Sequence, residues 1–111
     1  MNLNKKLHLL SSLAILAIYS IAGSAFAADI DHGAQIFSAN CSACHAGGNN
    51  VIMPEKTIKS DALEANEMNS VAAITTQVTN GKNAMPAFGA RLDGTDIEDV
   101  ANYVLSQADK W

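Results

Sequence analysis

Residues 41–45 of this 111-residue chain read Cys41-Ser42-Ala43-Cys44-His45. The pattern Cys-x-x-Cys-His is the attachment signature of a c-type haem. Two thiols three positions apart lie about one helical turn apart, so both can reach the vinyl groups of one porphyrin, and the adjacent imidazole is then held beneath the iron. The stretch therefore predicts a haem c bonded to Cys41 and Cys44 through thioethers and ligated by His45.

Three other interpretations of the two cysteines explain less. A disulfide between Cys41 and Cys44 would close a very short loop, which limits its entropic gain, and would leave His45 unexplained. A thioredoxin-like dithiol expects a βαβ context, and a structural zinc site needs four ligands. Because His32 is the one other histidine after the N-terminal segment and the chain has no further cysteine, the sequence favours haem.

A second axial ligand decides whether the haem iron is closed for electron transfer or open to a substrate. The candidates are Met53, Met68 and Met85. Met68 could fill core space, as methionine often does, and Met53 follows His45 by only eight residues. Met85 lies about forty residues after the histidine, on a loop that Pro86 stiffens. We expect Met85 to reach the opposite face of the haem, where its neutral thioether would raise the reduction potential relative to a second histidine.

The N-terminal segment has the order of a secretory signal. A short basic region precedes an apolar run over residues 9–22, and Ala25 and Ala27 then occupy the two positions where signal peptidase requires small side chains. The sequence predicts a signal peptide over residues 1–27 and a cytochrome c domain over residues 28–111. A membrane anchor is the alternative, but the apolar run falls short of the ~20 residues that span a bilayer.

The acidic charge of the chain argues against nucleic-acid binding. The formal net charge is −4, and it becomes −6 when Lys5 and Lys6 leave with the signal peptide. An acidic surface favours solubility and steers the protein towards basic patches on protein partners. A mature chain of about 84 residues is also small for a stable core, so we expect a cofactor to add stability.

Apolar residues at helical spacing predict four helices. The first covers residues 31–45, a short one covers 61–65, and a third lies between 69 and 80. The C-terminal helix carries the clearest apolar stripe, formed by Ile97, Val100, Ala101, Val104, Leu105 and Ala108. Because no stretch alternates with period two for long enough to form a strand, the sequence predicts an all-α fold, with long loops over 46–59 and 82–92 that pack against the cofactor.

Polar residues at the helix ends predict where the helices begin and stop. Ser60 and Asn69 are expected to cap the two central helices. Thr95 with Glu98 has the spacing of a capping box for the C-terminal helix. Asn80-Gly81 is expected to end the third helix, since this pair favours a turn.

Several segments outside the haem motif carry a family resemblance. They are residues 33–37, Asn40 together with the haem motif, Gly47-Gly48, residues 53–57, Gln77-Val78, residues 80–88, Arg91-Leu92 and the terminal Trp111. This set resembles cytochrome c6 of algae and cyanobacteria, and it extends over essentially all of the mature chain.

The resemblance implies a class I cytochrome c fold, with His45 and Met85 as axial ligands. It implies that Gln77 lies beside the haem and tunes its potential, and that Arg91 assists docking near the exposed haem edge. Taken alone, Gln77 could be an exposed helix residue and Arg91 a solvated loop charge.

The resemblance also implies a cellular role. It implies residence in the thylakoid lumen and electron delivery from cytochrome f of the cytochrome b6f complex to photosystem I. We expect a monomer, without a membrane anchor after cleavage of the signal peptide. The short presequence fits a plastid-encoded algal protein or a cyanobacterial one, since a nuclear-encoded protein would need a transit peptide as well.

Other functions remain open from the residues themselves. The same chemistry would serve a periplasmic carrier to a respiratory oxidase. If Met85 is only a packed loop residue, the haem would be five-coordinate and the protein an enzyme or a gas sensor. A haem-free thiol protein is the third alternative. We expect an electron carrier and not an enzyme.

Overall fold

The computed structural model describes residues 27–111. The predicted signal peptide therefore lies outside the described residues, apart from Ala27. The described part forms α2 (Ile30–Asn40), α3 (Ser42–His45), the 3-10 helix η1 (Ala46–Gly48), α4 (Ser60–Ala65), α5 (Val71–Asn80) and α6 (Gly94–Gln107). Within residues 27–111 no strand forms, and one isolated bridge joins Lys82 and Met85. The all-α prediction is confirmed.

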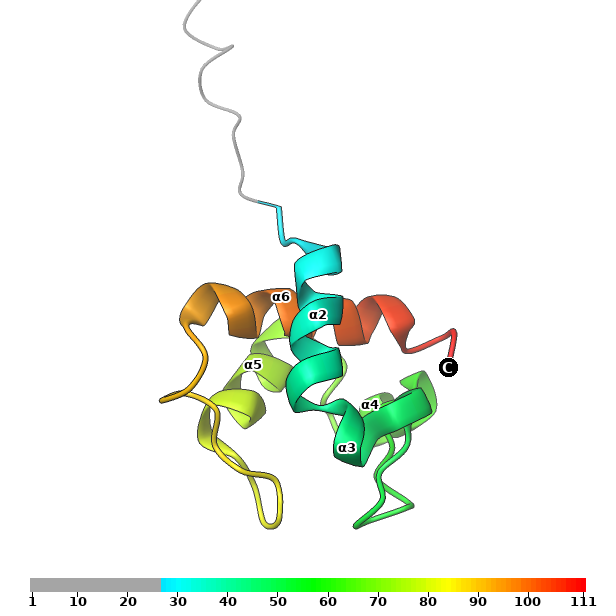
Figure 1. The fold of residues 1–111 in the computed structure, drawn as a ribbon. Helices are drawn as coiled ribbons and strands as arrows, with labels where there is room; N and C mark the ends of the chain where they lie inside the picture. Colours follow the sequence, from blue (N-terminus) through cyan, green and yellow to red (C-terminus); the bar gives the residue numbers. More distant parts are fainter. Residues whose placement is uncertain (1–26) are drawn as a thin grey trace, which may run out of the picture.

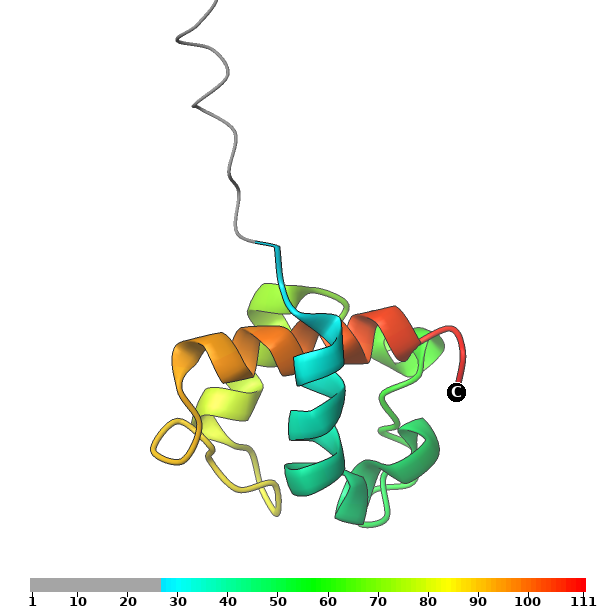
Figure 2. The same ribbon diagram turned by 45° about the horizontal axis from the view of Figure 1, so that its top comes forward.

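Helix α6 is the centre of the fold, because it contacts both α2 and α5. Helix α2 runs steeply across α6 in both ribbon views (Figures 1 and 2). At the crossing, a Cβ atom on Gly33 of α2 would overlap the backbone of Asp99 of α6, so glycine permits this close approach. The buried apolar side chains around it are Phe37, Leu63, Ile74, Val78, Phe88, Ile97, Val100, Ala101, Val104 and Ala108.

The start of α6 differs from the sequence prediction. Asp93 caps the helix by accepting a hydrogen bond from the Asp96 amide at 2.8 Å, and the Asp96 side chain accepts one from the Asp93 amide at 3.2 Å. The capping box predicted from Thr95 and Glu98 is therefore wrong by two residues. Two carboxylates also suit the positive end of the helix dipole. The predicted stripe is buried except for Leu105, which is half-buried.

The caps predicted for the two central helices are also displaced. Ser70, and not Asn69, caps α5 by accepting a hydrogen bond from the first turn of the helix. Lys59 precedes α4, and the Ser60 hydroxyl instead donates to the carboxylate of Asp109. Ser60 does not act as the cap because it is already the first residue of α4.

The helix predicted over residues 31–45 is broken at Cys41, where α2 ends and α3 begins. Two side chains bond carbonyl groups of the preceding turn at this point. The Asn40 amide donates to the carbonyl of Ile36 at 3.0 Å, and the Ser42 hydroxyl donates to that of Ser38 at 2.7 Å. Such bonds compete with the helix ladder and bend helices.

Two irregular segments complete the fold, as predicted. Residues 49–59 follow η1, and residues 81–93 join α5 to α6. The Ile58 amide donates to the Gly48 carbonyl at 2.9 Å and closes the first segment, while the Phe88 amide bonds the end of α5 at 2.9 Å. Both segments extend below the crossing of α2 and α6 in Figure 1. Side chains of both line one pocket. Within the described range, no helix is long and apolar enough to cross a membrane.

Candidate functional site

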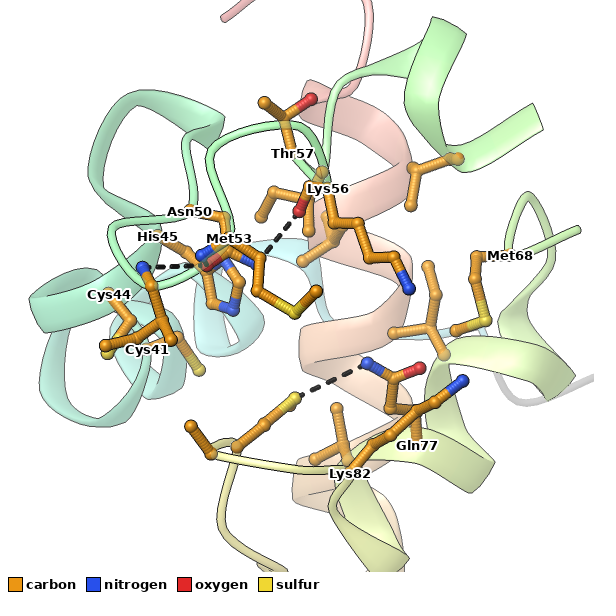
Figure 3. A pocket seen from close by; sticks show the side chains of 18 of the residues that line it. Cys41, Cys44, His45, Asn50, Met53, Lys56, Thr57, Met68, Gln77 and Lys82 are labelled. Carbon is orange, nitrogen blue, oxygen red and sulfur yellow. Dashed lines mark hydrogen bonds between the residues drawn. The ribbon is translucent and has the colours of Figure 1, made fainter. Parts of the chain in front are cut away.

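A pocket of about 350 Å³ lies between the two irregular segments, a volume within the range of small-molecule sites. Cys41, Cys44 and His45 line one wall, while Gln77 and Met85 line the other. Figure 3 shows the cysteines and the histidine on one side of the space and Gln77 on the other. The remaining lining is mainly apolar, so the pocket brings the predicted thiols, imidazole and thioether around one space.

Cys41 and the helix α3 that follows it place both thiols and the imidazole on the same wall. The amides of Cys44 and His45 both donate to the Cys41 carbonyl, at 3.2 and 2.9 Å, so one helical turn spans the motif. Both cysteines carry free thiols. Burial raises the pKa of the Cys41 thiol to about 11, so this thiol is neutral at physiological pH and suits an apolar wall.

The imidazole of His45 has a defined orientation. Its Nδ1 atom lies 2.9 Å from the backbone carbonyl oxygen of Asn49. Because a carbonyl oxygen can only accept a hydrogen bond, Nδ1 carries a proton, and Nε2 is the ring nitrogen that can serve as a ligand. A hydrogen bond of this kind fixes the ring plane and raises the basicity of the other nitrogen, as metal-ligating histidines require.

The opposite wall is built from a tight turn that follows α5. Gly81 ends the helix with a φ of 68°, and the amides of Lys82 and Met85 each donate to the other residue's carbonyl, at 3.0 and 2.9 Å. Asn83, inside this turn, has a φ of 53°, a conformation that asparagine tolerates better than most residues. The turn returns the chain towards the pocket and presents Met85 to it.

Gln77 gives the Met85 sulfur a specific partner. Its Nε2 atom donates to Met85 Sδ at 3.6 Å, the contact drawn as a dashed line at Gln77 in Figure 3. Met53 and Met68 also line the pocket, so access alone does not select one methionine. The amide contact orients the sulfur of Met85.

Arg91 is the one predicted site residue that does not line the pocket. Its guanidinium carbon lies 4.7 Å above the centre of the Phe88 ring, a cation–π contact, and Phe88 does line the pocket. Arg91 is exposed, and Phe88 lies between it and the pocket.

Several polar lining residues were not identified as site residues from the sequence. Lys56 and Lys82 line the pocket and are labelled in Figure 3. Asn50 bonds the Lys56 carbonyl at 2.9 Å through its amide, and its oxygen accepts from the amide of Met53 at 2.9 Å. Lys56 and Lys82 lie in two of the segments that carry the family resemblance, but nothing singled them or Asn50 out as site residues, because lysines and asparagines are usual in solvated loops.

The lining fits the predicted haem. A large flat ring needs apolar walls, two free thiols on one side, and an imidazole nitrogen opposite a thioether sulfur. Two cations at the same pocket suit the carboxylates at the edge of a porphyrin. Residues of this structure supply each of these groups.

Comparisons with known proteins agree with this geometry. A family model described as cytochrome C oxidase, cbb3-type, subunit III matches residues 28–104. Cytochrome c6 of Pyropia yezoensis is 62% identical over 108 residues, which cover 97% of this chain and 98% of that protein. Cytochrome c6 of Bumilleriopsis filiformis is 77% identical over 83 residues, which cover 75% of this chain and 96% of the relative.

A solved structure of cytochrome c6 from the diatom Phaeodactylum tricornutum superposes with a TM-score of 0.70 and 56% sequence identity. The match covers 72% of this chain and 94% of the diatom protein. The helices around the pocket therefore form a class I cytochrome c fold. Since the curated relatives match over nearly their whole length, the chain belongs to the cytochrome c6 family.

Proposed function

We propose that this protein is a soluble one-electron carrier that holds one haem c and takes electrons from cytochrome f of the cytochrome b6f complex to photosystem I. The observation that carries the proposal is the pocket itself. Two free thiols, an imidazole oriented through its Nδ1 atom and an oriented thioether sulfur surround one mainly apolar space. Membership of the cytochrome c6 family supports the same function.

Four side chains would hold the haem. Cys41 and Cys44 would form the two thioethers, His45 would ligate through Nε2, and Met85 would ligate through Sδ. The haem would supply a one-electron couple between ferric and ferrous iron. Because protein atoms would take both axial positions, no position is left for a substrate, and this favours a carrier over an enzyme.

The remaining wall residues would tune and shield the site. The Gln77 amide donates to the Met85 sulfur and withdraws electron density from it. The apolar lining excludes water and so disfavours the more highly charged ferric state. Both effects would raise the reduction potential, as an oxidising carrier requires.

The docking surface would combine charge with exposed apolar residues near the pocket. Val51 and Ile52 are 62% and 61% exposed, and Ile52 also lines the pocket. Arg91 stacks on Phe88 beside the same site. Such a surface suits short-lived binding to two partners in turn, with Arg91 as a candidate contact to photosystem I.

We also propose that residues 1–27 are a signal peptide that directs the domain of residues 28–111 to the thylakoid lumen. The family model begins to match at residue 28. The relative from Bumilleriopsis filiformis aligns with 75% of this chain but with 96% of its own length. Both observations fit a precursor, and the N-terminal sequence of the protein isolated from thylakoids would test the cleavage site.

The test of the function uses the purified holoprotein and isolated photosystem I. After a flash, the reduction of the oxidised photosystem is followed by absorbance at increasing carrier concentration. We expect second-order reduction that slows as salt is added, because charge steering is screened over a Debye length of about 8–10 Å near physiological ionic strength. Negligible reduction at low salt by a protein that holds haem would contradict the photosynthetic role.

A carrier to a respiratory oxidase is the second candidate. It is favoured by the description of the matching family model, which is that of an oxidase subunit. The same holoprotein, reduced and mixed with a membrane oxidase, distinguishes the two roles. Rapid oxidation there, together with negligible reduction of photosystem I, would favour this candidate.

A further inference from the structure

The last residue of the chain is packed into the wall behind the haem motif. Gly48 is buried with a φ of 76°, and a Cβ atom at this position would lie 2.6 Å from Cδ1 of the Trp111 indole. The indole Nε1 donates to the carbonyl of Ile58 at 3.3 Å, and the ring centre lies 5.3 Å from that of Phe37. The indole therefore lies between α2 and both ends of the 48–58 segment.

Backbone hydrogen bonds at the C-terminal end of α6 hold Trp111 in place. The Trp111 amide donates to the carbonyl of Gln107, the last residue of α6, at 3.2 Å. The Ser60 amide donates to the carbonyl of Ala108, a buried residue, at 3.0 Å. Figure 2 shows the C-terminus beside the segment that precedes α4. The central helix of the fold thus holds this segment through its own C-terminal end.

A short path leads from the indole to His45. The Ile58 amide donates a hydrogen bond to the Gly48 carbonyl at 2.9 Å. Trp111 therefore contacts two residues that are bonded to each other. Asn49 follows Gly48 directly, and its carbonyl accepts the hydrogen bond from His45 Nδ1 at 2.9 Å. A displacement of Gly48 would move this carbonyl and release the imidazole.

We propose that Trp111 is a positioning residue for the His45 ligand. Its indole fixes Gly48 and Ile58, these fix the Asn49 carbonyl, and the carbonyl sets the plane and tautomer of the imidazole. The inference rests on the proposed function, because it takes His45 as the iron ligand. Trp111 itself touches neither His45 nor the motif cysteines through any of the contacts described above.

Proton exchange in the reduced holoprotein tests this inference. We compare Trp111→Ala and Trp111→Phe with the unchanged protein by NMR and measure the exchange of the His45 Nδ1 proton and of the Ile58 amide. Both should exchange at least about tenfold faster in Trp111→Ala, since local opening then frees both hydrogen bonds. Trp111→Phe should keep the His45 proton within about threefold of the unchanged protein, because a flat ring still packs on Gly48.

Tyr103→Leu is the matched control. The centre of the Tyr103 ring lies 5.4 Å from that of Phe37 and 6.1 Å from that of Trp111, so its loss weakens the same aromatic cluster and leaves the hydrogen bond from Trp111 to Ile58 in place. The His45 proton should then exchange within about threefold of the unchanged protein. If Trp111→Ala yields no holoprotein, Trp111→Leu takes its place, because leucine keeps apolar volume without the indole plane or its N–H group.

Two results would overturn the inference. One is an unchanged exchange rate of the His45 proton in Trp111→Ala or Trp111→Leu, and the other is an equal acceleration in Tyr103→Leu. Failure of the proposed function would look different. The protein without any substitution would then lack the added mass of a covalent haem, and its His45 resonances would not be shifted by haem. The Ile58 amide would still report the contact with Trp111 in that case.

Discussion

At the scale of single residues, the hydrogen-bond partners of His45 and Met85 distinguish them from the other histidine and methionines near the site. The chain has other methionines at the same pocket, Met53 and Met68, and another histidine, His32. His45 differs by its carbonyl partner, and Met85 differs by its amide partner. Each partner orients the atom that would bind iron, so the two residues are prepared as ligands and not only placed near the pocket.

Replacing Met85 by alanine should open one axial position. We expect Met85→Ala to lower the reduction potential, because a soft thioether stabilises ferrous iron. The ferrous form should also bind carbon monoxide rapidly at neutral pH. A redox titration and a carbon monoxide binding assay check the two effects.

Met53→Ala and Met68→Ala are the controls for this experiment, since both residues line the same pocket. Neither should make the ferrous iron open to carbon monoxide. A Met85→Ala protein with an unchanged potential would assign the ligand to one of these two methionines, and the proposed site would be wrong at that position.

The Gln77 amide should raise the potential through the Met85 sulfur. Gln77→Leu keeps the side-chain volume but removes the N–H donor, so the sulfur donates more strongly to ferric iron. We expect the potential to fall by about 60 mV, which is a tenfold change in a one-electron equilibrium. An equal or higher potential, measured by redox titration, would mean that the Gln77 amide does not raise the potential.

That Cys41, Cys44 and His45 line one pocket could be predicted from the sequence because they form a local motif. Its five residues lie within one turn of helix, so spacing alone defines their geometry. The contact of Gln77 with Met85 joins a helix to a loop, and only the family resemblance suggested a role for Gln77. The hydrogen bond from Trp111 to Ile58 spans 53 residues of chain, and no local pattern indicates it.

At the scale of elements, the turn after α5 determines where Met85 lies. Gly81 has a φ of 68°, and a Cβ atom there would lie 2.6 Å from the Met85 carbonyl oxygen and 2.7 Å from the Ala87 amide nitrogen. The helix end and the methionine loop therefore fit together only through a residue without a side chain.

Gly81→Ala should destabilise the holoprotein by about 1–3 kcal/mol, because it adds both backbone strain and a close contact. Urea unfolding followed by absorbance measures the change in free energy. Gly94→Ala is the matched control, since nothing lies within 4 Å of a Cβ atom in this first turn of α6. That variant should be neutral or more stable by about 0.5–1 kcal/mol, because alanine favours helix more than glycine does. Equal effects of the two variants would contradict the role of Gly81.

The sequence predicted which segments form helices better than it predicted where those helices begin and end. The apolar stripe of α6 identified the helix, but two pairs three residues apart compete for its start. Asp93 with Asp96 and Thr95 with Glu98 both have capping-box spacing, and the structure uses the first pair. The break at Cys41 was missed for a related reason, since periodicity does not register the side-chain bonds that bend a helix.

At the scale of the whole molecule, one buried carboxylate joins the start of α2 to α6. Asp99 of α6 is buried and accepts hydrogen bonds from the Asp29 amide at 2.9 Å and from His32 Nδ1 at 2.9 Å. Asp96 lies 3.6 Å from the other ring nitrogen of His32. The hydrogen bond to Asp99 raises the pKa of His32 above its ordinary value of 6.5, and the same bond lowers the pKa of Asp99 below 3.8.

The two shifts set a window of pH in which this link stabilises the fold. The contribution of His32 is fully present below the unfolded pKa of 6.5 and is lost as pH rises through the raised folded pKa. The contribution of Asp99 is present above 3.8 and is lost as pH falls through the lowered pKa. The link between α2 and α6 is therefore strongest in mildly acidic solution, between about pH 4 and 6.5.

His32→Asn should remove the loss of stability that occurs as pH rises through the raised pKa of His32. Asparagine places an amide near the position of Nδ1 but does not titrate, so the link to Asp99 no longer depends on protonation. We expect the free energy of unfolding of the unchanged holoprotein to fall between pH 6 and 8 relative to that of His32→Asn, while haem-linked titrations common to both proteins cancel in the difference. Parallel stability curves for the two proteins across this range would show that folding does not change the pKa of His32, and the dependence of this link on protonation would then be wrong.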